Sequence, residues 1–139
     1  MMTTVRELMS QHPECAQGQD TLVTVAAKMR DVGVGSVPIC DEDQRAIGIL
    51  TDRDIVVGCV ADGGAPEQTR VQDVIHSEPV CVGASHPADE ALTLMSRHRI
   101  RRIPVLDRDQ RVIGVIAQAD IAREQPETQT GSVVSDISR

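Results

Sequence analysis

The sequence repeats itself at a constant spacing of 66 residues, and few folds can accommodate such a repeat. Residues 5–55 align with residues 71–121 without a gap. The identical pairs include Pro13 and Pro79, Cys15 and Cys81, Met29 and Met95, Pro38 and Pro104, and Asp54 and Asp120. A fixed period indicates one supersecondary unit used twice, with each copy covering apolar surface that the other cannot bury alone. Because any cleft formed by the two copies is built twice, the repeat predicts a module with paired binding sites.

The composition narrows the classes of protein to which the chain can belong. Its 139 residues suffice for one domain or for two half-domains that share a core. It has no aromatic residues, so the core must be aliphatic and no aromatic platform is available for stacking nucleic-acid bases. The net charge of −7 opposes binding to nucleic acid or to anionic membranes. We expect a cytoplasmic protein with four reduced cysteines, since the sequence has neither a signal peptide, nor a membrane span, nor a CxxC pair.

Local patterns predict the same order of elements in both copies. In each copy a strand, a helix, two strands and a second helix follow a short leading helix. The predicted helices begin near residues 21 and 51 in the first copy and near residues 87 and 118 in the second. The predicted later strands cover residues 36–40 and 46–50, and residues 102–106 and 112–116. The fold class is therefore α/β.

The predicted boundaries follow the repeat and the loop composition. We expect the first repeat with its leading helix at residues 1–61, a Gly- and Pro-containing linker at 62–68, and the second repeat at 69–125. Residues 126–139 are rich in polar and small side chains, which indicates a flexible tail.

The segment Gly-Ile-Leu-Thr-Asp-Arg-Asp at residues 48–54 and its counterpart at residues 114–120 closely resemble the motif of the CBS domain, named after cystathionine β-synthase. The element order and the proline-containing strands strengthen the resemblance, which covers residues 5 to about 123. It implies two repeats that are related by pseudo-twofold symmetry, share one core and form two clefts. In this family such clefts commonly hold AMP, ADP, ATP or S-adenosylmethionine, and no cofactor is required.

The resemblance assigns ligand-binding roles to Thr51 and Asp54 in the first repeat and to Asp120 in the second. The aspartate would accept hydrogen bonds from both ribose hydroxyls, each worth roughly 1.5–3 kcal/mol when water is excluded. The second repeat lacks the threonine but carries Arg101 and Arg102, where family members place phosphate-binding groups. A simpler alternative is that Thr51 and Asp54 only cap a helix and that the arginines only form a solvated helix end.

Two cysteines suggest a second function. Cys15 and Cys40 are expected on parallel neighbouring strands, which would bring their sulfurs within disulfide reach. Stand-alone tandem CBS proteins of the hypoxic-response type resemble this chain in length and in the absence of an attached enzyme domain. The chain could thus be a stress- or redox-response protein with vacant clefts, acting through a disulfide, a metal bound with help from His12, or protein–protein interaction. Two buried thiols in an aliphatic core are the simpler alternative.

The predicted function is a regulatory module that senses an adenosine-type nucleotide. No nucleophile elbow, HExxH, Walker or GxGxxG motif supports an enzyme, and no metal site is expected beyond the two cysteines. CBS modules usually pair face to face, so a homodimer and an unidentified protein partner are expected.

Overall fold

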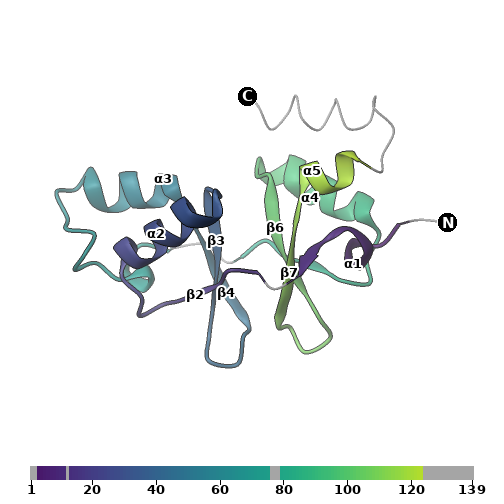
Figure 1. Ribbon diagram of the computed structural model, residues 1–139, viewed down its shortest axis with the longest axis horizontal. Coiled ribbons are helices and arrows are strands. Elements are labelled where there is room, and N and C mark those ends of the chain that lie inside the picture. The colour runs from purple at the N-terminus through teal and green to yellow at the C-terminus, as the bar shows by residue number, and fades with distance from the viewer. Residues whose placement is uncertain (1–2, 12, 76–78, 124–139) are drawn as a thin grey trace. The chain divides into compact units, whose positions relative to one another are not determined.

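The computed structural model describes residues 3–11, 13–75 and 79–123 (Figure 1). The chain divides into two compact units, one formed by Glu14–Pro79 and the other by Met1–Pro13 together with Val80–Arg139. The tail that the sequence predicts to be flexible, residues 126–139, lies outside the described residues. Among the described helices, none combines the length and the apolar character needed to cross a membrane.

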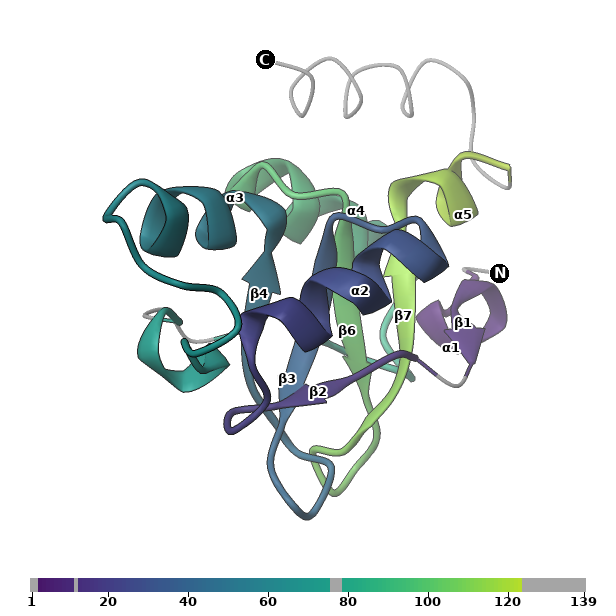
Figure 2. The same ribbon diagram turned by 60° about the vertical axis from the view of Figure 1, so that its left-hand side comes forward.

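The unit Glu14–Pro79, called the first unit, contains the first repeat in the predicted order. Its elements are β2 (Ala16–Gln17), α2 (Leu22–Val32), β3 (Ser36–Cys40), β4 (Ala46–Thr51), α3 (Asp52–Ile55), the π-helix η1 (Val56–Val60) and the 3₁₀-helix η2 (Val71–Asp73). The sheet order is β2-β3-β4, with β2 parallel and β4 antiparallel to β3. Helix α2 packs against β3, and α3 follows directly from the end of β4 and contacts α2 (Figure 2).

The other unit, called the second unit, contains the second repeat. Its elements are α1 (Val5–Leu8), β1 (Ser10–Gln11), β5 (Val82–Gly83), α4 (Ala88–His98), β6 (Arg102–Leu106), β7 (Val112–Ala117) and α5 (Gln118–Ala122). The sheet order is β1-β7-β6-β5, in which β5 and β6 are parallel and the other neighbours are antiparallel. The α/β fold class and the strand–helix–strand–strand–helix order are confirmed in both units.

Each unit uses the same hairpin turn, and the repeated residues explain why. Asp41 Oδ1 accepts hydrogen bonds from the backbone amides of Asp43 and Arg45, both at 2.9 Å. Asp107 Oδ1 accepts the equivalent bonds from Asp109 at 2.9 Å and Arg111 at 3.0 Å. An aspartate at the start of a turn can satisfy nearby amides in this way, so the local sequence alone specifies both hairpins.

The leading segments are residues 5–11 of the first repeat and residues 71–75 of the second, and each of them docks on the other repeat. The amides of Val5 and Arg6 donate to the carbonyls of His86 and Ala84, both at 2.9 Å, in the second unit. In the first unit, residues 71 and 72 donate to the carbonyls of residues 20 and 18, also at 2.9 Å. These two pairs of bonds correspond to each other at the 66-residue spacing. The exchange was not anticipated from the sequence.

Buried aliphatic side chains form one core cluster in each unit. Val5 is fully buried in the cluster of the second unit, whereas Val71 and Val74 are buried in that of the first. Each cluster is thus closed by the leading segment of the other repeat.

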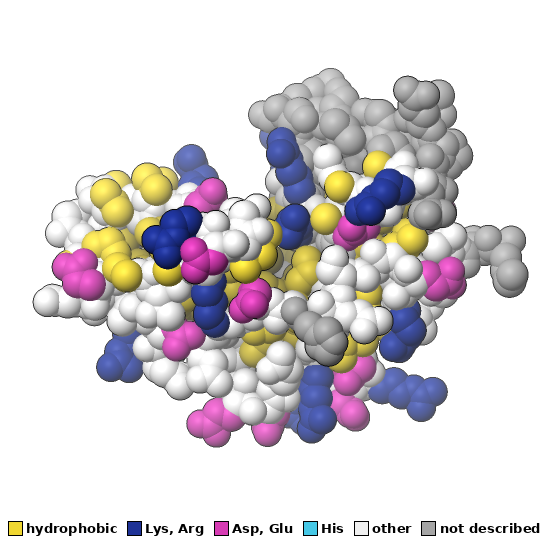
Figure 3. Space-filling model, in the orientation of Figure 1, with side chains coloured by type: hydrophobic (Ala, Val, Ile, Leu, Met, Phe, Trp, Pro, Cys, Tyr) yellow, Lys and Arg dark blue, Asp and Glu magenta, His cyan; other side chains and the backbone are white. Residues whose placement is uncertain are grey.

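Helix η1 exposes apolar side chains at the surface of the first unit. Val56, Val57 and Val60 are 57%, 49% and 54% exposed. Figure 3 shows hydrophobic side chains at the surface of this region, at the left of the view.

Candidate nucleotide-binding site

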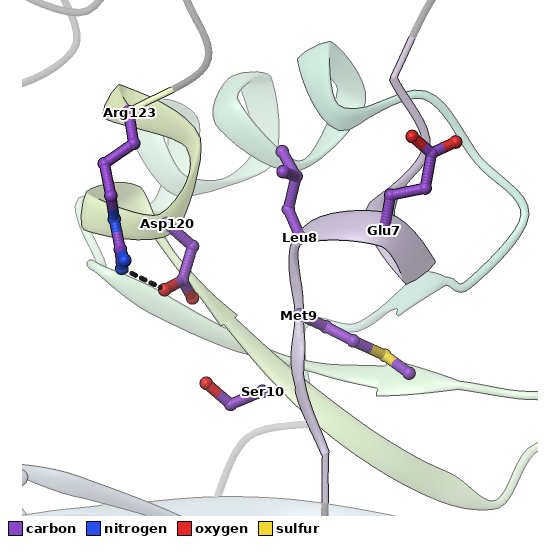
Figure 4. A pocket seen from close by; sticks show the side chains of 6 residues that line it. All are labelled: Glu7, Leu8, Met9, Ser10, Asp120 and Arg123. Atoms are coloured by element: carbon purple, nitrogen blue, oxygen red, sulfur yellow. Dashed lines mark hydrogen bonds and ion pairs between the residues drawn. The ribbon is translucent and has the colours of Figure 1, made fainter.

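A pocket of about 340 Å³ lies entirely within the second unit (Figure 4). It is lined by Glu7, Leu8, Met9, Ser10, Asp120 and Arg123. The first four residues belong to the leading segment, and the last two belong to α5 and the residue that follows it. The volume falls in the range of small-molecule sites. The exchanged leading segment thus supplies one wall of the pocket, and the end of the CBS-like motif supplies the other.

Gly114 allows the leading segment to lie this close to β7. Strand β1 pairs with β7 so that Ser10 lies opposite Val115 and Gln11 lies opposite Gly114. A Cβ atom on Gly114 would lie 2.6 Å from Met9 Sδ and 2.7 Å from the Ser10 carbonyl oxygen. Both distances are shorter than van der Waals contact, so only glycine fits here.

Asp120 presents its carboxylate to the pocket from the first turn of α5. Its Oδ2 accepts a hydrogen bond from the backbone amide of Ala117 at 2.9 Å, which fixes the side-chain position. Its Oδ1 accepts a hydrogen bond from the guanidinium of Arg123 at 3.0 Å. The Asp120 side chain is only 16% exposed, whereas that of Arg123 is 73% exposed. The carboxylate is therefore a shielded acceptor, and its cationic partner can move into solvent.

Arg101 and Arg102 lie close to the start of α5. The Arg101 carbonyl accepts a hydrogen bond from the backbone amide of Gln118 at 2.9 Å, and Arg102 lies opposite Ala117 in the pairing of β6 with β7. The fold therefore brings the predicted arginines to the same end of β7 as Asp120. Their side chains are not part of the pocket lining.

In the first unit, Thr51 and Asp54 form the capping box that the sequence predicts. The Thr51 amide donates to Asp54 Oδ2 at 2.9 Å, and the Asp54 amide donates to Thr51 Oγ1 at 3.1 Å. Within the described part of the chain, Asp54 Oδ1 has no hydrogen-bond partner. The counterparts of Met9 and Ser10 are Ile75 and His76, and His76 lies outside the described residues.

Cys15 and Cys40 lie together in the first unit, where β2 and β3 are parallel as predicted. The sequence predicts Cys15 on the first of these strands, but β2 begins one residue later, at Ala16, and Cys40 ends β3. A hydrogen bond with the buried Cys40 thiol lowers the pKa of the half-buried Cys15 thiol below its usual value of 9.0. The positive charge of Lys28 and a hydrogen bond from Gln44 Nε2, 3.6 Å from Cys15 Sγ, lower the pKa further, while burial and Glu14 oppose the shift. By contrast, burial raises the pKa of the Cys81 thiol to about 11.

Both repeats match the sequence model of the CBS domain, at residues 5–59 and 71–127. The chain belongs to the CBS domain family. One relative is hypoxic response protein 1 of Mycobacterium tuberculosis, which is 37% identical over 126 residues, covering 91% of this chain and 87% of that protein. The crystal structure of Hypoxic Response Protein I with two coordinated zinc ions is also similar. It has a TM-score of 0.82 and 36% identity, covering 89% of this chain and all of that one.

Two CBS structures determined with bound adenosine compounds have the same fold. The CBS domain pair of protein MJ0100, in complex with 5′-methylthioadenosine and S-adenosyl-L-methionine, has a TM-score of 0.77 and 24% identity, covering 89% of this chain and 96% of that one. CBSX2 in complex with AMP has a TM-score of 0.75 and 19% identity, covering 91% and 98% of the two chains.

The CBS motif pointed to Asp120 but not to the rest of the pocket. Arg123 follows Asp120 by three residues on a helix, a spacing that brings side chains together and could have predicted the ion pair. No local pattern marks Met9 or Ser10, because these residues reach Asp120 only through the exchange of leading segments.

Proposed function

We propose that this CBS pair is a regulatory module that binds an adenosine-type nucleotide in the pocket of the second unit. The observation that carries the proposal is the shielded Asp120 carboxylate facing a pocket of small-molecule size. The complexes of MJ0100 with S-adenosyl-L-methionine and of CBSX2 with AMP support this class of ligand. AMP, ADP, ATP and S-adenosylmethionine are the candidates.

Asp120 would act as the acceptor for the two ribose hydroxyls. An ionised carboxylate offers about four lone-pair positions on its two oxygens, and the bonds from Ala117 and Arg123 use two of them. Charge-assisted hydrogen bonds to a shielded carboxylate are about twice as strong as neutral ones. Arg101 and Arg102 would contribute phosphate contacts, and Thr51 with Asp54 would form the corresponding site of the first repeat.

Binding would be read out through the leading segment. The ligand would contact both Ser10 and Asp120, and the chain continues from Ser10 into the first unit, which begins at Glu14. If the ligand binds more tightly to one conformation of the chain between Ser10 and Glu14, it raises the population of that conformation. A partner protein can then recognise this conformation. The proposal includes a homodimer and an unidentified protein partner. It includes no catalytic step.

The test is calorimetric titration and thermal unfolding of the reduced protein with AMP, ADP, ATP and S-adenosylmethionine. Ligand at 100 times its Kd should add about 2.7 kcal/mol of stability, on the order of 6–12 °C in Tm. Asp120→Asn should abolish binding in the pocket. Asp107→Asn is the matched control, since Asp107 also accepts hydrogen bonds from backbone amides but lies at the opposite end of β7 from Asp120. The proposal would be refuted if none of the four compounds produced a heat of binding and none of them changed Tm.

We propose a reversible disulfide between Cys15 and Cys40 as a second function, because their thiols are already hydrogen-bonded and Cys15 has a lowered pKa. An oxidant such as oxidised glutathione would take up two electrons and two protons as the two S–H bonds are replaced by one S–S bond. The metal alternative would use Cys15 and Cys40 with help from His12, which lies outside the described residues, and Hypoxic Response Protein I coordinates zinc. Among the residues that the structure describes, no three His, Cys, Asp or Glu side chains form a cluster.

Mass spectrometry tests the disulfide directly. After treatment with oxidised glutathione, the intact chain should lose the mass of two hydrogen atoms, and peptide mapping should join Cys15 to Cys40. Cys59→Ser should leave this bond intact, whereas Cys15→Ser should prevent it. A bond that forms elsewhere, or thiols that stay reduced, would reject this second function.

A further inference from the structure

The pocket contains an internal ion pair that competes with the proposed ligand. Arg123 binds Asp120 Oδ1 through one guanidinium nitrogen, and its Nε donates to the Ala119 carbonyl at 3.3 Å. Figure 4 shows the guanidinium and the carboxylate pointing towards each other at one side of the pocket. A ribose diol that binds Asp120 must share Oδ1 with Arg123 or displace it.

The first repeat lacks this ion pair. The residue that corresponds to Arg123 at the 66-residue spacing is Val57, and Asp54 Oδ1 has no partner among the residues that the structure describes. The two repeats therefore present the same aspartate in different charge environments.

We propose that Arg123 makes the pocket of the second unit selective for adenosine compounds that carry a phosphate, over uncharged adenosine and the sulfonium cation of S-adenosylmethionine. This inference rests on the proposed function and narrows its ligand class.

The selectivity follows from what happens to Arg123 when the ribose binds. The Arg123 side chain is 73% exposed and holds the shielded Asp120 carboxylate through a single guanidinium nitrogen, so a ribose hydroxyl can replace it on Oδ1 while the guanidinium stays hydrated. The released guanidinium stays at the pocket, where a phosphate can form a bidentate pair with it. Adenosine offers no such partner, and a sulfonium cation is repelled.

The other charged residue of the pocket lining, Glu7, does not neutralise Arg123. Glu7 Oε1 accepts a hydrogen bond from the Thr4 hydroxyl at 3.1 Å. In Figure 4 the Glu7 carboxylate points away from the Asp120–Arg123 pair, on the far side of Leu8. The positive charge of Arg123 is therefore the one that an incoming ligand meets beside Asp120.

Calorimetric titration of the full chain with AMP, adenosine and S-adenosylmethionine tests this role. We expect the wild-type protein to bind AMP about tenfold or more tightly than either other compound, the effect of one charge-assisted hydrogen bond. Arg123→Gln should remove most of this preference while leaving adenosine binding as tight or tighter. Arg123→Lys should retain part of it. Arg108→Gln, an equal loss of charge in the turn at the opposite end of β7, should leave the preference unchanged.

The two proposals fail in different ways. If wild-type and Arg123→Gln proteins show the same ratio of AMP to adenosine affinity, the role of Arg123 is overturned and the nucleotide site stands. If neither AMP nor adenosine binds the wild-type protein, both proposals are overturned.

Discussion

Replacing Gly114 with alanine should detach the leading segment from the second unit. The new Cβ would lie 2.6 Å from Met9 Sδ and 2.7 Å from the Ser10 carbonyl oxygen. The methionine side chain can turn aside, but the carbonyl belongs to the β1 backbone and can yield only if the strand moves. Overpacking of this kind typically costs about 1–3 kcal/mol. We expect the upper part of this range, because the backbone contact leaves no side-chain escape.

Gly48→Ala is the matched control, because Gly48 occupies the same position in the first repeat. There the new Cβ would lie 3.1 Å from Ile75 Cδ1, the end of a flexible side chain. We expect less than about 1 kcal/mol of destabilisation, since that methyl group can shift. Both substitutions restrict the unfolded chain equally, so the difference between the two variants isolates the clash.

Thermal unfolding and hydrogen exchange measure the effect. A loss of about 2–3 kcal/mol in Gly114→Ala should lower Tm on the order of 6–12 °C. The amides of Ser10 and Gln11 should exchange faster, and nucleotide binding should weaken because Met9 and Ser10 line the pocket. Equal Tm values for Gly114→Ala and Gly48→Ala, with unchanged exchange at β1, would refute the argument that this glycine holds the leading segment in place.

Other expected outcomes concern thiol reactivity and helix ends. Iodoacetamide alkylates only the thiolate form of cysteine. The lowered pKa of Cys15 gives it a larger thiolate fraction at pH 7.5 than Cys81, whose pKa is about 11. Labelling followed by mass spectrometry should therefore show that Cys15 is modified much faster than Cys81. Cys40→Ala should raise the Cys15 pKa by removing the hydrogen bond that lowers it most, so labelling of Cys15 at pH 7.5 should slow; faster labelling would contradict this. Gly33 ends α2 at φ 80°, so Gly33→Ala should cost about 1 kcal/mol by urea unfolding. Arg99 ends α4 at φ 56°, a left-handed conformation that glycine adopts more easily. Arg99→Gly should therefore leave the free energy of unfolding unchanged or raise it, and a clear loss of stability would exclude strain at this residue.

Much of the candidate site could be predicted because its parts are local. The motif identified Asp120 and the Thr51–Asp54 pair, and the predicted capping box is present. The cysteine prediction rested on two parallel neighbouring strands, and Cys15 does lie beside Cys40, although β2 begins one residue after Cys15. The ligand-binding roles themselves stay predictions until they are measured.

The sequence by itself determined the element order, the hairpins and the helix ends, because these depend on residues within a few positions of each other. Asp41 and Asp107 show this most directly, since each organises its own turn. Only the tertiary structure decided which repeat each leading segment completes. Val5 and Val71 are identical and form equivalent backbone bonds, so no local pattern distinguishes docking on the same copy from docking on the other. That long-range choice brings Met9 and Ser10 to Asp120 and forms the pocket.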